Sequence, residues 1–280
     1  MLRRLSAGLL AVTVIALVAA FAIGFRDYLR RDATPPPPKV AAIATPPPAT
    51  GTPSPAATAT PTPAPLPPSV LIASVPYTVQ APDNDWDAAH EEYCEAAAVT
   101  MVGLYYQGVT YADNVIPAAT ADADMAGIVA WERQTFPGQL NLSLADMAQD
   151  GLHFYGLQSS IQPLDLTAIQ RYLANGQPVI IPVMTHGGPG GSMINPHYGS
   201  ENVYHVIVLV GYNAAQGIVY TNDAGINQGQ NLAYAWTTLQ TAVQSMVDTP
   251  VDQSGIPVPT SQGASMLVFS KGRTDSPSSG

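Results

Sequence analysis

Apolar residues in the middle of this chain recur with two periods, one typical of strands and one typical of helices. Short apolar runs at residues 75–79 and 179–184 predict two strands. Two further runs, at residues 204–212 and 217–221, predict a β-hairpin that turns at residues 213–216. The pattern therefore indicates a sheet whose strands lie mostly in the second half of the chain.

The strongest helical pattern covers residues 92–106, and Gly108 follows it as a stop signal. Apolar side chains spaced by three and four residues would form one face of this helix. The positions that repeat in this way are Ala97, Ala98, Met101, Leu104 and Tyr105.

Two further helices are expected later in the chain. Asp165 is a suitable N-cap for one that ends at Asn175 and Gly176, and residues 237–246 predict the other. A helix followed by strands, without regular strand–helix–strand alternation, favours an α+β fold. We expect the first helix to pack on an antiparallel sheet.

The N-terminal region carries an uncharged apolar run at residues 5–25, directly after Arg3 and Arg4. Twenty-one residues in a helix are long enough to cross the hydrocarbon core of a membrane. We assign residues 1–31 to a membrane anchor. The small residues Ala20 and Ala22 leave a cleaved signal peptide open as the alternative.

Residues 32–69 form a Pro/Thr/Ala-rich linker, since 14 of the chain's 27 prolines fall within residues 33–68. Such a composition favours an extended spacer and is commoner outside cells than inside them. We therefore expect a single-pass protein of the cell membrane whose domain, residues 70–272, is extracellular, or a secreted protein if the signal is cleaved. Residues 273–280 are expected to be a disordered tail.

The charge of the domain is strongly acidic. The whole chain has a formal net charge of -10, and residues 68–272 hold 17 acidic residues against only Arg133, Arg171 and Lys271. Such a surface repels phosphate backbones, so we expect no nucleic-acid partner. The single cysteine excludes an intrachain disulfide, and we expect a monomer.

Cys94 is a candidate nucleophile because it falls at the start of the strongest helix. Free N–H groups and the helix dipole stabilise a thiolate at that position. Three neighbouring carboxylates, Glu91, Glu92 and Glu95, oppose this effect and require a cationic partner. The alternative is that Cys94 is a small buried apolar side chain.

Three polar residues could complete a site with Cys94. His205 begins an apolar strand and could act as general base, or it could be an inert core histidine. Asp223 ends the next strand, where its carboxylate could orient the imidazole, although it also suits a turn. Gln80 lies 14 residues before the cysteine and could donate to an oxyanion.

The order of these residues resembles the C39-like cysteine peptidases, which are relatives of the bacteriocin-processing peptidase domains in the papain-like superfamily. The resemblance covers residues 74–269 and rests on four segments: 75–80, 92–106, 205–213 and 219–223. It implies a papain-like fold. It further implies that Cys94 is the nucleophile, His205 the base, Asp223 the orienting acid and Gln80 the oxyanion donor.

The predicted function is therefore an extracytoplasmic, membrane-anchored cysteine peptidase that acts on peptides or proteins. Many members of the family carry Gly-Pro after the cysteine, whereas Glu95 and Ala96 follow it here. Two alternatives stay open, a cell-wall peptide amidase or transpeptidase and a non-catalytic surface-binding module. No cofactor or metal is expected, because the spacings of His186, His197 and His205 match no compact metal motif.

Overall fold

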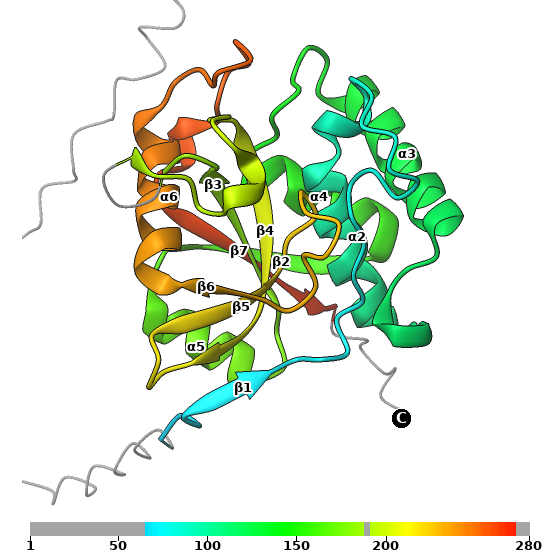
Figure 1. Cartoon of the computed structure of the whole chain (residues 1–280). Helices are drawn as coiled ribbons and strands as arrows, with labels where there is room; N and C mark the ends of the chain where they lie inside the picture. Colours follow the sequence, from blue (N-terminus) through cyan, green and yellow to red (C-terminus); the bar gives the residue numbers. More distant parts are fainter. Residues whose placement is uncertain (1–64, 188–190, 273–280) are drawn as a thin grey trace, which may run out of the picture. The chain divides into compact units, whose positions relative to one another are not determined.

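The computed structural model describes residues 65–187 and 191–272 (Figure 1). The predicted anchor, nearly all of the predicted linker and the predicted tail lie outside these ranges. None of the helices in the described ranges has the length and apolar character needed to cross a membrane. At the start of the described part, the carbonyl oxygens of Pro67 and Pro68 accept hydrogen bonds from Tyr212 Oη and from the Ala214 N–H.

One antiparallel sheet of seven strands forms the centre of the domain (Figure 1). Six strands follow the order β2-β7-β3-β4-β5-β6, and β1 pairs with β4. The close approach of β1 requires a residue without a side chain, because a Cβ on Gly211 would lie 2.4 Å from the Val70 carbonyl oxygen. The strands are β1 (Ser69–Leu71), β2 (Leu157–Pro163), β3 (Val179–Met184), β4 (Tyr204–Asn213), β5 (Ile218–Asn222), β6 (Leu232–Ala235) and β7 (Ser265–Lys271).

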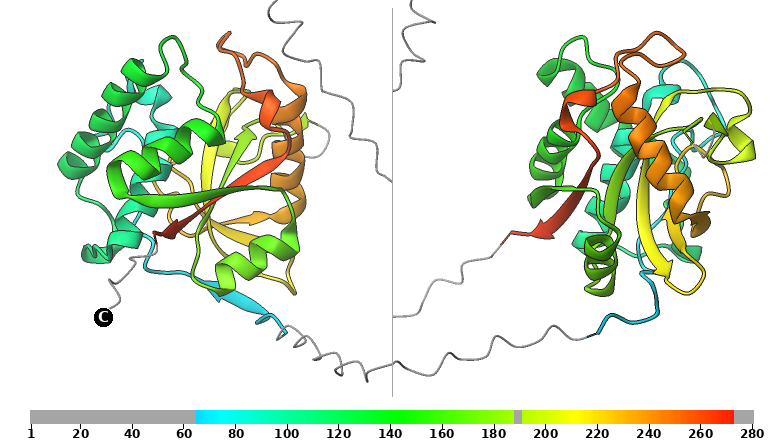
Figure 2. Two further views of the ribbon diagram at one scale, coloured as in Figure 1. Left: turned by 180° about the vertical axis from the view of Figure 1, so that it is seen from behind. Right: turned by 90° about the vertical axis from the view of Figure 1, so that its left-hand side faces the viewer.

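Helices cover both faces of this sheet. Helix α6 packs on one side, while α2, backed by α3 and α4, lies on the other (Figures 1 and 2). The α-helices of the described residues are α2 (Cys94–Gln107), α3 (Ala118–Thr135), α4 (Leu144–Tyr155), α5 (Leu166–Ala174) and α6 (Trp236–Asp248). The α+β class and the position of the cysteine-bearing helix on an antiparallel sheet are confirmed.

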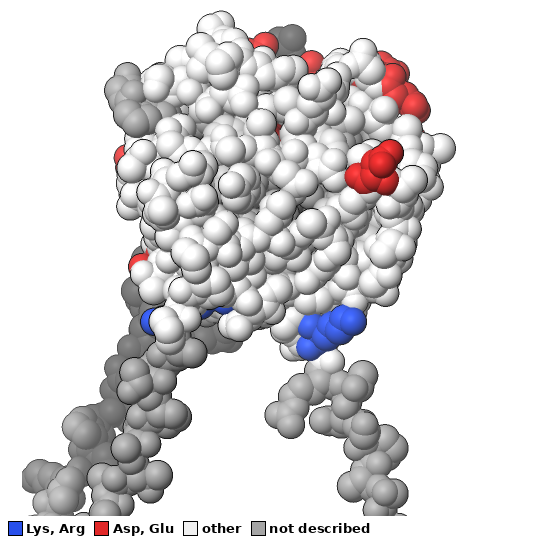
Figure 3. All heavy atoms as spheres, turned by 60° about the horizontal axis from the view of Figure 1, so that its bottom comes forward, with Lys and Arg blue, Asp and Glu red and all other residues white. Residues whose placement is uncertain are grey.

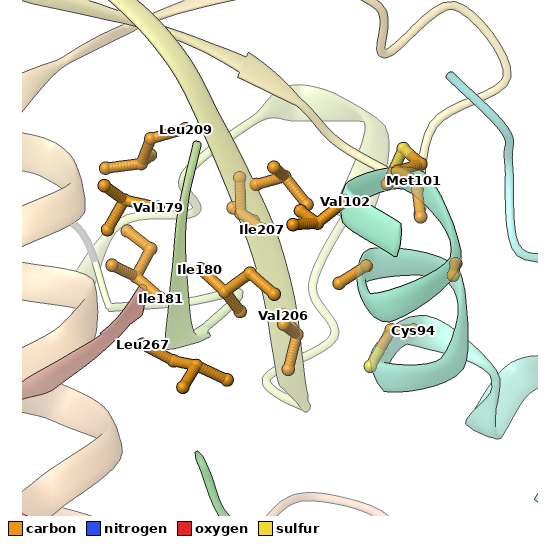
Figure 4. Close-up of a cluster of buried hydrophobic side chains, with 14 of the residues drawn as sticks. Cys94, Met101, Val102, Val179, Ile180, Ile181, Val206, Ile207, Leu209 and Leu267 are labelled. Carbon is orange, nitrogen blue, oxygen red and sulfur yellow. The ribbon is translucent and has the colours of Figure 1, made fainter. Parts of the chain in front are cut away.

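Helix α2 is the most deeply buried helix of the described domain. Its residues from Cys94 to Leu104 are all buried, so this helix is covered on every side. Figure 4 shows Val102 and Cys94 of this helix facing the apolar side chains of β4, with those of β3 beyond. Small residues allow this close packing: a Cβ on Gly103 would meet the ring of Tyr155 at 2.4 Å.

Most of the elements expected from the sequence are present. Helix α2 matches the prediction for residues 92–106, and Gly108 ends it in a left-handed conformation at φ 75°. The N-cap prediction for Asp165 is also confirmed, because its side chain accepts a hydrogen bond from the Ala168 N–H at 2.7 Å. Strands β4 and β5 form the expected hairpin.

The predicted strand at residues 75–79 is wrong. This segment makes only an isolated bridge, between Tyr77 and Val115. Side-chain amides take the place of a strand partner: Asn114 and Asn222 both donate to the Val75 carbonyl oxygen. An extended apolar segment can therefore be buried without joining the sheet.

Several elements carry too weak a pattern to be found from the sequence. Helix α3 is rich in alanine and buries only five of its 18 residues. Strand β2 has the sequence LQSSIQP and is largely exposed at the edge of the sheet. Apolar periodicity identifies elements by the face that they bury, so elements with little buried surface escape it.

Candidate active site

His205 and Asp223 meet across neighbouring strands. His205 is the second residue of β4, and Asp223 directly follows β5, which pairs with β4. His205 Nε2 lies 2.8 Å from Asp223 Oδ1, and both side chains are buried. The imidazole is therefore held by its Nε2 atom, which leaves Nδ1 as the nitrogen able to accept a proton.

The carboxylate of Asp223 accepts hydrogen bonds from three further donors. Tyr198 Oη and the Gly225 N–H donate to Oδ1 at 2.6 and 3.1 Å, and Tyr234 Oη donates to Oδ2 at 2.6 Å. Burial alone would raise the pKa of Asp223, but the His205 charge and these bonds hold the pKa below its usual value. Asp223 is thus a buried carboxylate that stays ionised.

Cys94 is the first residue of α2 and is only 4% exposed. Figure 4 shows its side chain projecting from the start of the helix toward β4, on the side of Val206. The backbone of Val206 lies close enough to the sulfur to lower the pKa of the thiol, although burial has the larger, opposite effect. Because Val206 directly follows His205, the sulfur lies against the same part of β4 as the imidazole.

A carboxylate accepts a hydrogen bond from the Cys94 thiol. Cys94 Sγ donates to Glu95 Oε2 at 3.0 Å, and Glu95 Oε1 accepts a hydrogen bond from the Leu142 N–H at 2.9 Å. Burial, followed by the charge and hydrogen bond of Glu95, raises the pKa of Cys94 well above its usual value, and Glu92 adds to this effect. The predicted opposition of Glu92 and Glu95 to a thiolate is confirmed, and in this conformation the thiol keeps its proton.

Gln80 lies beside these residues, but the N–H donors of its side-chain amide are occupied. Its Nε2 donates to the carbonyl oxygens of His90 and Glu91, each at 2.9 Å. The Gln80 backbone N–H donates to Ala224, which fixes this segment next to Asp223. An oxyanion would have to replace one of the two carbonyl acceptors to receive a bond from this amide.

A pocket of about 490 Å³ lies beside His205 and Gln80. Most of the other residues that line it come from the segment before α2, the loop between β3 and β4, and the loop after α6; Asn141, Tyr204 and Gly225 complete the lining. Cys94 is not one of the described residues that line this pocket. A ligand in the pocket would thus contact His205 directly, whereas the sulfur would have to turn toward it.

Two further buried carboxyl groups lie behind Glu95, on α3 and α4. No donor in the described chain bonds either side-chain oxygen of Asp150, and Glu132 lies within hydrogen-bonding reach of it. A bond between two carboxyl groups requires one of them to hold a proton. Burial and the neighbouring negative charges raise the pKa of both groups, so the pair shares a proton at neutral pH.

The residues missed by sequence reasoning are the two tyrosines that hold Asp223. Tyr198 lies in a short 3-10 helix between β3 and β4, and Tyr234 lies on β6. Nothing in their local sequence marks them, because their role depends on contact with Asp223, which is 25 positions from Tyr198 and 11 positions from Tyr234. No group of three acidic, histidine or cysteine side chains suited to a metal ion occurs in the described ranges.

The model of the Peptidase_C39 like family matches residues 72–249, which include Cys94, His205, Asp223 and Gln80. The chain belongs to the Peptidase_C39 like family. This membership confirms the resemblance drawn from the sequence and places the protein among the cysteine peptidases. No curated protein matches the sequence.

Two solved structures are similar to this C39-like chain. One is described as a C39-like peptidase from Bacillus anthracis; it is 15% identical, with a TM-score of 0.46, and the match covers 73% of this chain and 98% of that one. The other is xylellain, a cysteine protease from Xylella fastidiosa; it is 12% identical, with a TM-score of 0.33, and the match covers 74% and 87% of the two chains.

Proposed function

We propose that this C39-like protein hydrolyses peptide bonds with a triad of Cys94, His205 and Asp223. The observation that carries the proposal is the bond between His205 Nε2 and Asp223 Oδ1, formed on the part of β4 that also contacts the Cys94 sulfur. The imidazole is oriented through Nε2 by an ionised carboxylate, which leaves Nδ1 available to take a proton. This is the arrangement that a thiol nucleophile and its general base require.

The reaction starts from a neutral thiol. His205 Nδ1 takes the proton from Cys94 as the sulfur attacks the peptide carbonyl carbon, and Asp223 stabilises the imidazolium that forms. The imidazolium then protonates the leaving amine, which breaks the C–N bond and leaves a thioester on Cys94. Water, deprotonated by His205, hydrolyses the thioester and restores the thiol.

The oxyanion that forms in each step needs donors. We propose Gln80 Nε2 for this role, together with the free N–H groups in the first turn of α2. Gln80 would exchange one of its two carbonyl acceptors for the oxyanion. The cost of this exchange is small because one hydrogen bond replaces another.

One movement precedes the chemistry. Cys94 Sγ has to leave Glu95 Oε2 and turn toward His205, which is a change of the χ1 rotamer. The structure describes the resting arrangement, in which the thiol is protected by burial and by Glu95. A substrate that occupies the pocket beside His205 would favour the turned conformation.

The test is hydrolysis of a peptide library by the full-length chain and by two variants. Cys94→Ala should abolish turnover, and His205→Ala should lower kcat/KM by at least about 10³-fold because the base is lost. Iodoacetamide gives a second measure, since His205→Ala should slow alkylation of Cys94. Turnover that survives Cys94→Ala, or alkylation that His205→Ala leaves unchanged, contradicts the triad.

A non-catalytic binding module is the second candidate, and the hydrogen bond between the thiol and Glu95 favours it. In that case a peptide would bind in the pocket without covalent chemistry. Peptide affinity that survives Cys94→Ser, with no turnover by the wild-type chain, would identify this function.

We further propose that residues 5–25 anchor the protein in the cell membrane and that the Pro/Thr/Ala-rich segment holds the domain outside the cell. The length and composition of these segments support the proposal. Full-length protein should sediment with membranes, and protease added to intact cells should release the domain. Recovery of the protein from the cytosolic fraction would contradict it. That the domain is a monomer stays a prediction, which sedimentation of the released domain tests.

A further inference from the structure

The pocket beside His205 and Gln80 carries an excess of negative charge. Glu91, Glu92, Glu201 and Asp252 all line it, and its described lining contains no lysine or arginine. These carboxylates come from three separate segments of the chain, before α2, before β4 and after α6. The fold therefore gathers them around one cavity.

These carboxylates have no cationic partner within the described part of the chain. All ion pairs found there involve a histidine, and none of them uses a pocket carboxylate. Asp252 is fixed by neutral donors, the Asn141 side chain and the Ile256 N–H, at 3.2 and 3.0 Å. Its negative charge is thus held in place without being neutralised.

The carboxylates also affect one another. Burial raises the pKa of Glu92 to about 7, and the charges of Glu95, Asp252 and Glu91 contribute to the rise. Repulsion of this kind costs stability, which a bound cation would recover. The basic side chains of the described domain do not supply that cation, because none of them lines the pocket; on the face shown in Figure 3, Lys and Arg atoms lie at the lower edge.

Two more features of the pocket suit a cation with N–H donors. Gln80 is only 4% exposed, lines the pocket, and has a buried Oε1 atom that accepts no hydrogen bond within the described structure. Trp86 also lines the pocket. An acceptor without a donor and an aromatic face are both groups that an ammonium or guanidinium ion can use.

We propose that this pocket binds the cationic side chain of a peptide substrate, lysine or arginine, next to the bond that is cleaved. The proposal rests on the proposed peptidase function and adds the class of substrate to it. A neutral or acidic side chain in the same place would leave the carboxylates unpaired or add to their repulsion.

Peptides that differ in one charge test the proposal. The full-length chain is assayed with a library, and each cleaved lysine peptide is made again with acetyl-lysine and with glutamate at the lysine position. We expect kcat/KM to fall about tenfold for acetyl-lysine and further for glutamate, because a partly desolvated charge pair is lost. Equal rates for lysine and acetyl-lysine would overturn the proposal.

Variants of the pocket give a second test that does not depend on folding, since Glu91 and Glu201 are exposed. Glu91→Gln and Glu201→Gln should each lower the ratio of lysine to acetyl-lysine rates roughly two- to fivefold. Asp113→Asn is the matched control: Asp113 is exposed, lies outside the pocket lining, and should leave the ratio unchanged. A ratio that neither pocket variant changes would count against the proposal.

A binding measurement distinguishes failure of the pocket proposal from failure of the peptidase proposal. Calorimetry on the full-length Cys94→Ala variant measures its affinity for two five-residue peptides with blocked termini. One peptide has lysine at its central position, and the other has acetyl-lysine there. If the lysine peptide binds more tightly while the wild-type chain cleaves nothing, the peptidase proposal fails and the pocket proposal stands. If the wild-type chain cleaves both peptides equally well, the pocket proposal fails and the peptidase proposal stands.

Discussion

Two buried carboxylates lie on opposite sides of the candidate active site, and their surroundings differ. Asp223, on the sheet side, receives four hydrogen bonds, one of them from the imidazole of His205. Glu95, on the helix side, accepts one from a backbone N–H and one from the Cys94 thiol. The pKa of Asp223 is lowered, whereas burial raises the pKa of Glu95.

The difference shows that burial alone does not set the charge of a carboxyl group. Both residues are nearly inaccessible, at 0% and 3% exposed. The number of donors and the closeness of a cationic partner decide whether the pKa of each carboxyl group falls or rises. On the sheet side, Asp223 can therefore stabilise an imidazolium on His205. On the helix side, Glu95 favours the protonated thiol of Cys94.

The strongest test of this comparison replaces each carboxylate by its amide. Asp223→Asn should lower kcat/KM by about 10²- to 10⁴-fold, because the imidazole loses both its orientation and its charge partner. Glu95→Gln should change kcat/KM far less, since its side chain holds the thiol only at rest. The measurement is steady-state hydrolysis of one library peptide. Equal losses for the two variants would show that the two sides of the site do not differ in role.

A second prediction concerns the thiol itself. Glu95→Gln removes the negative charge next to Cys94, so the pKa of the thiol should fall and the thiolate fraction at pH 7 to 8 should rise. We expect iodoacetamide to alkylate Cys94 about tenfold faster in that pH range. The pH profile of alkylation, followed by mass spectrometry, measures the shift. An unchanged or higher pKa would contradict the role given to Glu95.

The tyrosines around Asp223 predict a smaller effect. Tyr234→Phe removes the only hydrogen bond that Asp223 Oδ2 accepts within the described residues, so kcat/KM should fall roughly fivefold through loss of support for the carboxylate. The lowered pKa of Asp223 contributes stability above its unfolded value of about 3.8, and that stability is lost as pH falls through the folded value. The variant should therefore unfold at a higher pH during acid titration.

Tyr198→Phe provides the matched comparison for this tyrosine. Its hydroxyl bonds Oδ1, which His205 and Gly225 also bond, so the remaining donors should limit the loss. Circular dichroism during acid titration measures both variants. A larger shift for Tyr198→Phe than for Tyr234→Phe would contradict this account of the Asp223 site.

The smallest expected effect lies behind Glu95, at the pair formed by Glu132 and Asp150. Because the pKa of Glu132 is raised from 4.5 to about 9, its protonated form favours the folded state, and stability falls as pH rises through that range. Glu132→Gln keeps a neutral donor to Asp150 and should therefore lose less stability than the wild type between pH 6 and pH 9. Urea unfolding at pH 6 and pH 9 measures this, and an equal difference at both values would argue against the shared proton.

The order of residues predicted much of this site. Cys94 at the start of a helix, His205 near the start of a buried strand and Asp223 at the end of the next strand follow from local patterns. The hairpin between residues 204 and 222 then forces the histidine and the aspartate together, because adjacent antiparallel strands bring the start of one to the end of the other. The hydrogen bond between His205 and Asp223 thus follows largely from the hairpin that the sequence pattern predicts.

Other features could not be predicted in this way. The two tyrosines on Asp223, the bond from Leu142 to Glu95 and the occupied amide of Gln80 join residues that local periodicity does not relate. The strand predicted at residues 75–79 failed for a similar reason, since side chains of Asn114 and Asn222 satisfy its backbone.

The sequence by itself therefore determined the α+β class, the family, the main helix and the identity of the candidate catalytic residues. Only the tertiary structure decided the protonation state of the Cys94 thiol, the direction in which the pKa of each buried carboxyl group shifts, and the acidic lining of the pocket. The physical reason is the separation of the interacting residues along the chain. Helices and hairpins depend on residues close in sequence, whereas the pKa of a buried group depends on all charges and donors that the fold brings around it.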